Sequence, residues 1–120
     1  MSVIYSINRN QKVVLTNVEG VVDGSQIISH QSRLRTDPNF KPNMNELMNC
    51  MALEDIKLTT IKLSDFVADS PWGTMAKRAV VVPNPRVFGL LRFFQALMSN
   101  EHGEIFIFNN VQSAREWLGI

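Results

Sequence analysis

Cysteine is nearly absent from this chain, because Cys50 is the only one among its 120 residues. A single cysteine forms no internal disulfide, and it excludes a metal site built from several cysteines of one chain. Long apolar runs are lacking too, since none approaches the roughly 20 residues that a helix needs to span a bilayer. The amino terminus, MSVIYSINRNQK, lacks the basic start, apolar stretch and cleavage site of a signal peptide. We therefore expect a cytoplasmic protein without a membrane span.

Charge of one sign is nowhere concentrated along the sequence. Twelve basic residues against eleven acidic residues leave a formal net charge of +1. No run of Lys or Arg is long enough to follow a phosphate backbone, which argues against nucleic-acid binding. The apolar fraction of 45% and the charged fraction of 19% are ordinary for a globular protein. We expect residues 1–120 to form a single domain.

Residues that commonly carry out catalysis are few and scattered. The only two histidines, His30 and His102, have no nucleophile near them in the sequence, and we expect both to be surface or turn residues. Cys50 lies between methionines, which favours a packed thiol over a reactive one. The carboxylates at 54–55, 65 and 69 lack a third ligand at metal-binding spacing, and the glycines at 20–24 lack the spacing of a phosphate-binding loop. The sequence thus predicts no catalytic centre, no metal site and no cofactor.

The period of the apolar residues alternates between that of strands and that of helices. Strands are predicted around residues 3–7, 13–16, 46–51, 79–82 and 104–108, with Gly20 closing the second of them. Asp23 and Gln26 form a potential capping box for a helix that ends before Pro38, with Ile27, Ile28 and Leu34 inward. A short helix is expected from Thr59 or Thr60, a longer one from Arg86 to about Ser99, and a last one capped by Asn110.

These segments predict an α/β protein with one mixed sheet and about four helices, in the order β-β-α-β-α-β-α-β-α. In the longest helix, Val87, Leu90, Leu91, Phe94, Leu97 and Met98 form the stripe expected to face the sheet, with Arg92, Gln95 and Ser99 opposite. In the last helix, the inward stripe contains Val111, Ala114, Trp117 and Leu118. Trp117 is therefore expected to dock that helix into the core.

Several segments together resemble the SpoIIAA-like (STAS/SEC14-like) family of bacterial proteins. The most specific are Arg78-Ala79-Val80-Val81-Val82, Phe88-Gly89-Leu90 with Arg92-Phe93-Phe94, Ile105-Phe106-Ile107-Phe108 and Ala114-Arg115-Glu116-Trp117-Leu118. The resemblance implies a STAS-like fold, related to anti-sigma-factor antagonists and more loosely to lipid-binding SEC14 domains, and it implies no reaction. Two positions depart from the pattern. Asn49 occupies a position where members of this family often have an acidic residue. Leu58-Thr59-Thr60-Ile61 occupies the place where the antagonists have an Asp-Ser-Ser-Gly phosphorylation signature.

Candidate binding residues lie at helix starts and on one helix face. Thr59, Thr60 and Arg86 are near predicted helix amino termini, where free N–H groups attract anions, although the sequence favours a simple helix cap at both places. Phe88 projects away from the core stripe and lies one turn before Arg92, with Phe93 at the flank. Aromatic residues and Arg are enriched in binding hot spots, so these residues are candidate contacts for a partner or ligand.

Two functions remain open from the sequence. The first is a non-catalytic regulatory or protein-interaction module of the SpoIIAA-like type, with a homodimer or another protein as partner. The second is a carrier of a small apolar or lipid-like ligand, which the comparison with SEC14 domains and the aromatic residues of the longest helix suggest.

Overall fold

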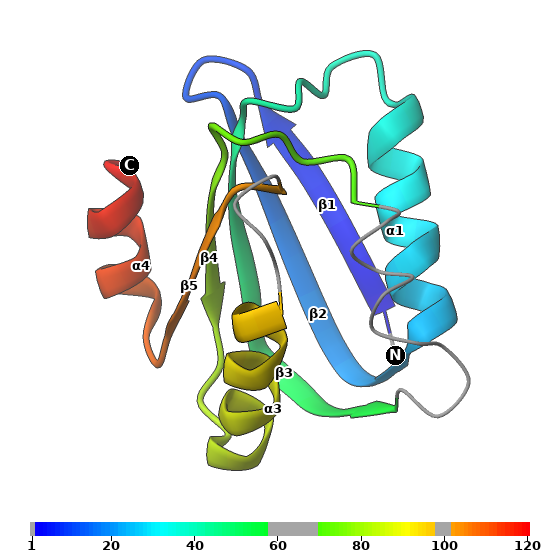
Figure 1. Cartoon of the computed structure of the whole chain (residues 1–120), viewed down its shortest axis with the longest axis vertical. Helices are drawn as coiled ribbons and strands as arrows, with labels where there is room; N and C mark the ends of the chain where they lie inside the picture. Colours follow the sequence, from blue (N-terminus) through cyan, green and yellow to red (C-terminus); the bar gives the residue numbers. More distant parts are fainter. Residues whose placement is uncertain (1, 58–69, 98–101) are drawn as a thin grey trace.

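The computed structural model describes residues 2–57, 70–97 and 102–120. These residues form one five-stranded sheet with strands in the order β1-β2-β3-β4-β5. Only β1 runs antiparallel to its neighbour, and the other three pairings are parallel (Figure 1). The predicted mixed α/β sheet is confirmed. The short helix expected from Thr59 or Thr60 lies outside the described residues.

The chain begins with a hairpin of β1 (Ser2–Asn8) and β2 (Val13–Asp23). The side-chain oxygen of Asn8 accepts from the backbone N–H of Gln11 at 3.0 Å, which braces the connecting turn. The prediction that Gly20 closes the second strand is wrong, because β2 continues to Asp23. Gly20 has a φ of 74° and lies at an irregularity in the pairing of β2 with β3, where the strand passes through a bulge and then resumes.

Helix α1 (Gly24–Thr36) begins with the predicted capping box. The Asp23 side chain accepts from the Gln26 N–H, and the Gln26 side chain accepts from the Asp23 N–H. Both bonds satisfy N–H groups that the first helical turn cannot pair internally. The helix ends at Asp37, whose N–H donates to the carbonyl of Leu34.

Strands β3 (Asn45–Lys57), β4 (Lys77–Val81) and β5 (Glu104–Phe108) complete the sheet. Helix α3 (Pro85–Leu97) connects β4 to β5, and α4 (Val111–Leu118) follows β5. The side chain of Asn110 caps α4 through the N–H of Ser113, as predicted. Gly119 ends that helix in the left-handed conformation with a φ of 76°, which glycine adopts without strain.

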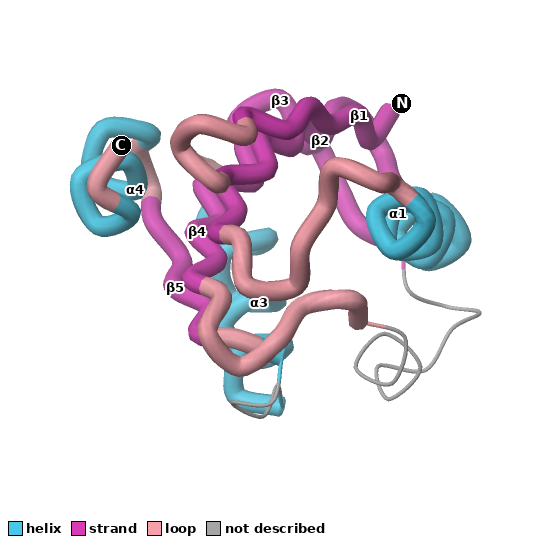
Figure 2. The backbone as a smooth tube through the Cα atoms, turned by 90° about the horizontal axis from the view of Figure 1, so that it is seen from above, coloured by secondary structure: helices cyan, strands magenta, loops and turns pink. Residues whose placement is uncertain are grey.

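The helices cover the two faces of the sheet unequally. Helices α1 and α3 lie on one face, here called the inner face, and α4 alone lies on the other, the outer face (Figure 2). Buried apolar residues of the inner face form two clusters, one of which contains Val18, Val80 and Val87 and the other Leu34, Phe40 and Trp72. The outer cluster is smaller and contains Leu47, Ala79, Val81, Ala114 and Leu118, with Trp117 packed against it. The predicted docking of α4 through Trp117 is confirmed.

None of the helices in the described ranges is long and apolar enough to cross a membrane.

Candidate functional site

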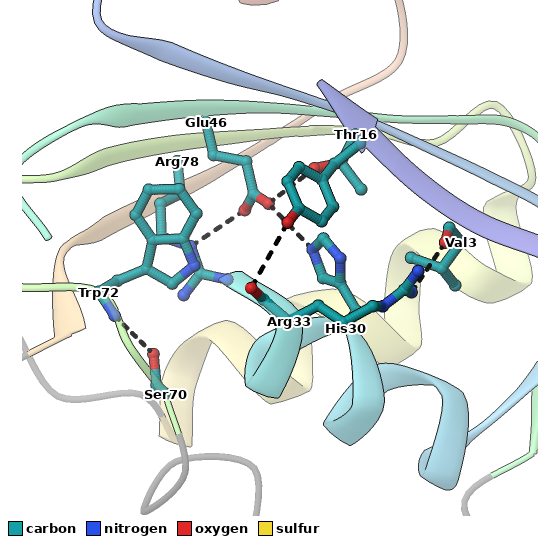
Figure 3. Close-up of polar contacts among 9 residues, drawn as sticks. Val3, Thr16, His30, Arg33, Glu46, Ser70, Trp72 and Arg78 are labelled. Carbon is teal, nitrogen blue, oxygen red and sulfur yellow. Dashed lines mark hydrogen bonds and ion pairs between the residues drawn. The ribbon is translucent and has the colours of Figure 1, made fainter. Parts of the chain in front are cut away.

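Polar residues meet on the inner face in the middle of the sheet. Thr16 of β2, Glu46 of β3 and Arg78 of β4 all point to this face, and Glu46 and Arg78 are register partners (Figure 3). The Thr16 hydroxyl donates to Glu46 Oε2 at 3.1 Å, and Arg78 Nε donates to Glu46 Oε1 at 3.2 Å. The parallel register therefore joins three side chains that are 30 or more residues apart in the sequence.

Glu46 is fully buried, with an exposed fraction of 0%. Burial alone would raise the pKa of its carboxyl group, but the nearby Arg78 guanidinium favours the charged carboxylate, and His30 adds to this effect. The net result is a pKa below the ordinary value, so Glu46 is ionised at neutral pH. A buried carboxylate is tolerated only when it is paired and hydrogen-bonded, and these contacts meet that requirement.

Helix α1 contributes His30 to this cluster. Its Nε2 atom lies 3.8 Å from Glu46 Oε2, which is too long for a hydrogen bond but close enough for electrostatic attraction. The Tyr5 ring meets the His30 ring edge to face, with 5.5 Å between centroids. His30 is only 3% exposed, so the prediction of a surface histidine is wrong. The α1 helix has few large apolar residues, and a polar ring occupies an inward position because Glu46 lies opposite.

Trp72 closes the other side of the cluster. Its ring stacks on the Arg78 guanidinium at 5.1 Å and packs edge to face against Phe40 at 5.0 Å. The backbone N–H of Trp72 donates to the hydroxyl of Ser70, as Figure 3 shows. Among the described residues, Arg78 Nη1 has no hydrogen-bond partner. The stacking therefore supplies the main contact for that part of the guanidinium.

We define the buried polar cluster as Thr16, His30, Glu46, Trp72 and Arg78. All five residues are at most 9% exposed, so a substrate would not reach the carboxylate or the imidazole in this conformation. The Cys50 thiol lies nearby on the same face of β3, where burial and the Glu46 charge raise its pKa to about 12. A thiol of that pKa is almost entirely protonated at neutral pH and is a poor nucleophile. The cluster has the geometry of a structural core network.

The predicted binding residues on α3 lie in a different place, at the start of that helix. Arg92 stacks on the Phe88 ring at 6.0 Å, so the predicted neighbours are brought together. Arg86 is exposed and forms an ion pair with Asp55 of β3 at 3.4 Å. This pair joins the carboxyl end of β3 to the first turn of α3. The contact between Asp55 and Arg86 was not predicted from the sequence.

The remaining predicted residues either lie outside the described part of the chain or have a different environment from the one expected. Thr59 and Thr60 lie outside the described residues, as does the side chain of Phe93. Gln95, expected on the solvated side of α3, is half-buried and donates to the carbonyl of Ile105. Position 95 faces the edge strand β5. The carbonyl of Ile105 needs a hydrogen-bond donor there, and an apolar side chain at position 95 would not provide one. The described residues contain no group of three His, Cys, Asp or Glu side chains that could hold a metal ion.

The buried polar cluster was not predicted from the sequence. A signal was present, because Glu46 and Arg78 each occupy an inward position of a strand whose other inward residues are apolar. A charge at such a position is unusual unless it is paired. Glu46 and Arg78 indicate a cluster only when they are considered together, because the register of β3 and β4 places them opposite each other.

No protein-family model matches this chain, and no curated protein matches it. Among solved structures, the chain is similar to an uncharacterised protein of the DUF3478 family from Shewanella loihica PV-4, described as having a SpoIIAA-like fold. The TM-score is 0.66 at 14% sequence identity, and the match covers 98% of this chain and 94% of that one. This similarity agrees with the resemblance carried by the motifs. The chain has a SpoIIAA-like fold.

Proposed function

We propose that this chain is a single STAS-like domain that acts as a non-catalytic protein-interaction module. The start of α3, with Arg86, Phe88 and Arg92, is the contact surface. The observation that carries this proposal is the stacked pair of Phe88 and Arg92, which places a half-buried aromatic ring and an exposed cation together on α3. Side chains of these types dominate the binding energy of many interfaces.

The charge of α3 indicates the chemistry of the partner. Residues 85–97 contain two arginines and no acidic residue. The Arg86 side chain is 69% exposed, so its ion pair with Asp55 is largely screened by solvent and leaves the guanidinium accessible. A second copy that binds through the same patch would place arginines against arginines, which is unfavourable. The surface therefore suits an acidic segment of a different protein.

The buried polar cluster supports a non-catalytic role. Its ionised residues are enclosed, and its one hydroxyl is committed to Glu46. An enzyme would need such groups to open toward a substrate. An enclosed network of this kind instead specifies how α1 and the loop around Trp72 pack on the sheet.

The proposal can be tested by cross-linking from Gly89, which follows Phe88. Gly89 is exposed, and a Cβ atom added there would meet nothing within 4 Å, so Gly89→Cys should fold normally. Because Cys50 is buried and its pKa is about 12, the new thiol would be the only readily labelled one. A benzophenone attached there and activated in extract from the source organism should form an adduct with an acidic protein.

The matched control carries the same label at Gln112→Cys, an exposed position of α4. Adding Arg92→Glu to the Gly89→Cys variant should reduce the adduct by about tenfold, since charge reversal repels an acidic partner. The purified partner should then bind the unlabelled protein with an affinity that falls as salt rises. Equal adducts from both positions, or no effect of Arg92→Glu, would contradict the proposal.

The alternative of an apolar or lipid-like ligand has a distinct result in native mass spectrometry. A lipid that remains bound to freshly purified protein, together with an absence of protein adducts at position 89, would favour the carrier over the interaction module.

A further inference from the structure

A polar hollow of about 310 Å³ lies at the other end of the sheet from the start of α3. The turn between β1 and β2 and the connection between α1 and β3 form its walls, both at the top of Figure 1. The described residues that line it are Arg9, Lys12, Pro38, Asn39, Lys41, Asn43 and Met44. Its volume is within the range of about 300–1,000 Å³ that is typical of small-molecule sites.

The hollow concentrates positive charge in a protein whose overall net charge is only +1. Three cationic side chains line it, and none of its described lining residues is acidic. Within the described ranges, the side chains of Arg9, Lys12 and Lys41 form no ion pair with a carboxylate. Three neighbouring cations without counter-ions repel each other, and a bound anion would relieve that repulsion.

The nearest carboxylate along the chain, Asp37, is already committed elsewhere. Its Oδ2 accepts from the Tyr5 hydroxyl at 2.8 Å, and its Oδ1 accepts from the Asn39 N–H at 2.9 Å. These bonds hold the carboxylate in its own loop rather than against the three cations. Asp37 therefore fixes the wall of the hollow and forms no ion pair with Arg9, Lys12 or Lys41.

Backbone hydrogen bonds brace both walls. The Asn45 N–H donates to the Lys12 carbonyl at 3.0 Å, which ties the β1–β2 turn to the start of β3. The Phe40 N–H donates to the Asp37 carbonyl, and the Met44 N–H donates to the Lys41 carbonyl. Beneath them, Met44 and Phe40 are buried in the core. The hollow is thus largely pre-formed, which lowers the entropy that a ligand would lose on binding.

We propose that this hollow binds a small molecule through a dianionic phosphate group. Arg9, Lys12 and Lys41 supply the positive charge, and the side-chain amides of Asn39 and Asn43 supply additional N–H donors to phosphate oxygens. The site is separate from the proposed protein contact, because β2 and β3 begin at the hollow, whereas α3 begins beyond the carboxyl end of β4. A single domain would then hold an anion at one end and a protein at the other.

Nuclear magnetic resonance titration of the full chain with inorganic phosphate, at constant ionic strength, tests this site. Saturable shifts should be confined to the amides of residues 9–12 and 37–44. The double variant Arg9→Ala/Lys41→Ala should weaken binding by at least about tenfold, since it removes two of three charges. The double variant Lys57→Ala/Arg115→Ala also removes two exposed cations, but away from the hollow, and should bind phosphate as the parent does.

Two results would overturn the proposal. One is equal loss of phosphate binding in both double variants, or unchanged binding in both, because the effect would then not depend on the hollow. The other is stronger binding to duplex DNA or to vesicles of anionic phospholipid than to phosphate, with the same dependence on Arg9 and Lys41. That outcome would assign the cations to a macromolecule or a membrane surface and not to a small phosphorylated molecule.

Discussion

The two faces of the sheet are covered by different kinds of contact. The inner face encloses ionised and polar groups, among them Glu46 and Arg78, beneath α1 and the loop around Trp72. On the outer face, α4 packs through apolar and aromatic contacts, and Trp117 meets Phe106 and Phe108 with ring centroids 5.1 Å and 5.8 Å apart. The outer contacts are only partly covered, since Phe106 remains 44% exposed.

This difference determines how the stability of each face responds to substitution. When an apolar side chain is truncated, the protein loses stability in proportion to the apolar surface that the side chain had buried, and a partly covered side chain buries less. A buried ion pair behaves differently, because removal of one partner leaves the other charged and unpaired in a medium of low polarity. The inner face should therefore tolerate paired replacements better than single ones, whereas the outer face should show no such asymmetry.

The largest expected effect is that of Glu46→Ala. The substitution leaves the Arg78 guanidinium buried without its carboxylate, so the free energy of unfolding should fall by about 3–5 kcal/mol. Urea denaturation followed by circular dichroism measures this loss. The double variant Glu46→Met/Arg78→Met should recover most of it, because two apolar side chains of similar length leave no unpaired charge. A double variant as unstable as the single one would show that charge pairing is not the cause.

Acid titration gives an independent measure of the same pair. The pKa of Glu46 is lower in the folded protein than its ordinary value of 4.5, so the ionised carboxylate stabilises the fold above about that pH. The stabilisation is lost as the pH falls through the folded pKa. Glu46→Gln should remove this part of the acid dependence. Asp23, whose pKa is also lowered by hydrogen bonds from Ser25 and Gln26, is replaced by Ser in both proteins so that it does not contribute.

A smaller effect is expected on the outer face, from Trp117→Ala. Trp117 is half-buried, so the loss in the free energy of unfolding should be about 2–3 kcal/mol, below that of a fully buried tryptophan. The exposed Gln112 of the same helix is the control, and Gln112→Ala should change stability by less than about 0.5 kcal/mol. If Trp117→Ala proved as costly as Glu46→Ala, the contrast between the two faces would not hold.

Much of the fold could be predicted from the sequence because its signals are local. The capping pair of Asp23 and Gln26, the cap at Asn110 and the β-branched run at 79–82 each depend on neighbouring residues. The stripe of α4 was equally clear, because 3.6-residue spacing places Ala114 and Leu118 on one side.

The candidate sites could be predicted only where their residues lie close together in the sequence. Phe88 and Arg92 are one helical turn apart, so their contact could be foreseen. Glu46 and His30 belong to different elements, and they meet only because the crossover through α1 packs that helix on β1 and β2, from where His30 reaches the neighbouring strand β3. The basic hollow has the same origin, since Lys12 and Lys41 lie on separate connections that the parallel pairing of β2 and β3 brings together.

The smallest expected effect belongs to the margin of the inner face, at Tyr5. The Tyr5 hydroxyl donates to Asp37 at 2.8 Å, so Tyr5→Phe should lower the free energy of unfolding by about 0.5–1.5 kcal/mol at neutral pH.

Burial, the hydrogen bond to Asp37 and the charge of that carboxylate raise the pKa of Tyr5 above 10.0, while Arg33 acts weakly in the opposite direction. The stabilisation should be present below pH 10.0 and disappear as the pH rises through the higher folded pKa. Tyr5 is the only tyrosine, so the tyrosinate absorbance reports its ionisation alone. Asp37→Asn should move that titration back toward pH 10.0, and a parent protein that already titrates there would show that Asp37 does not control Tyr5.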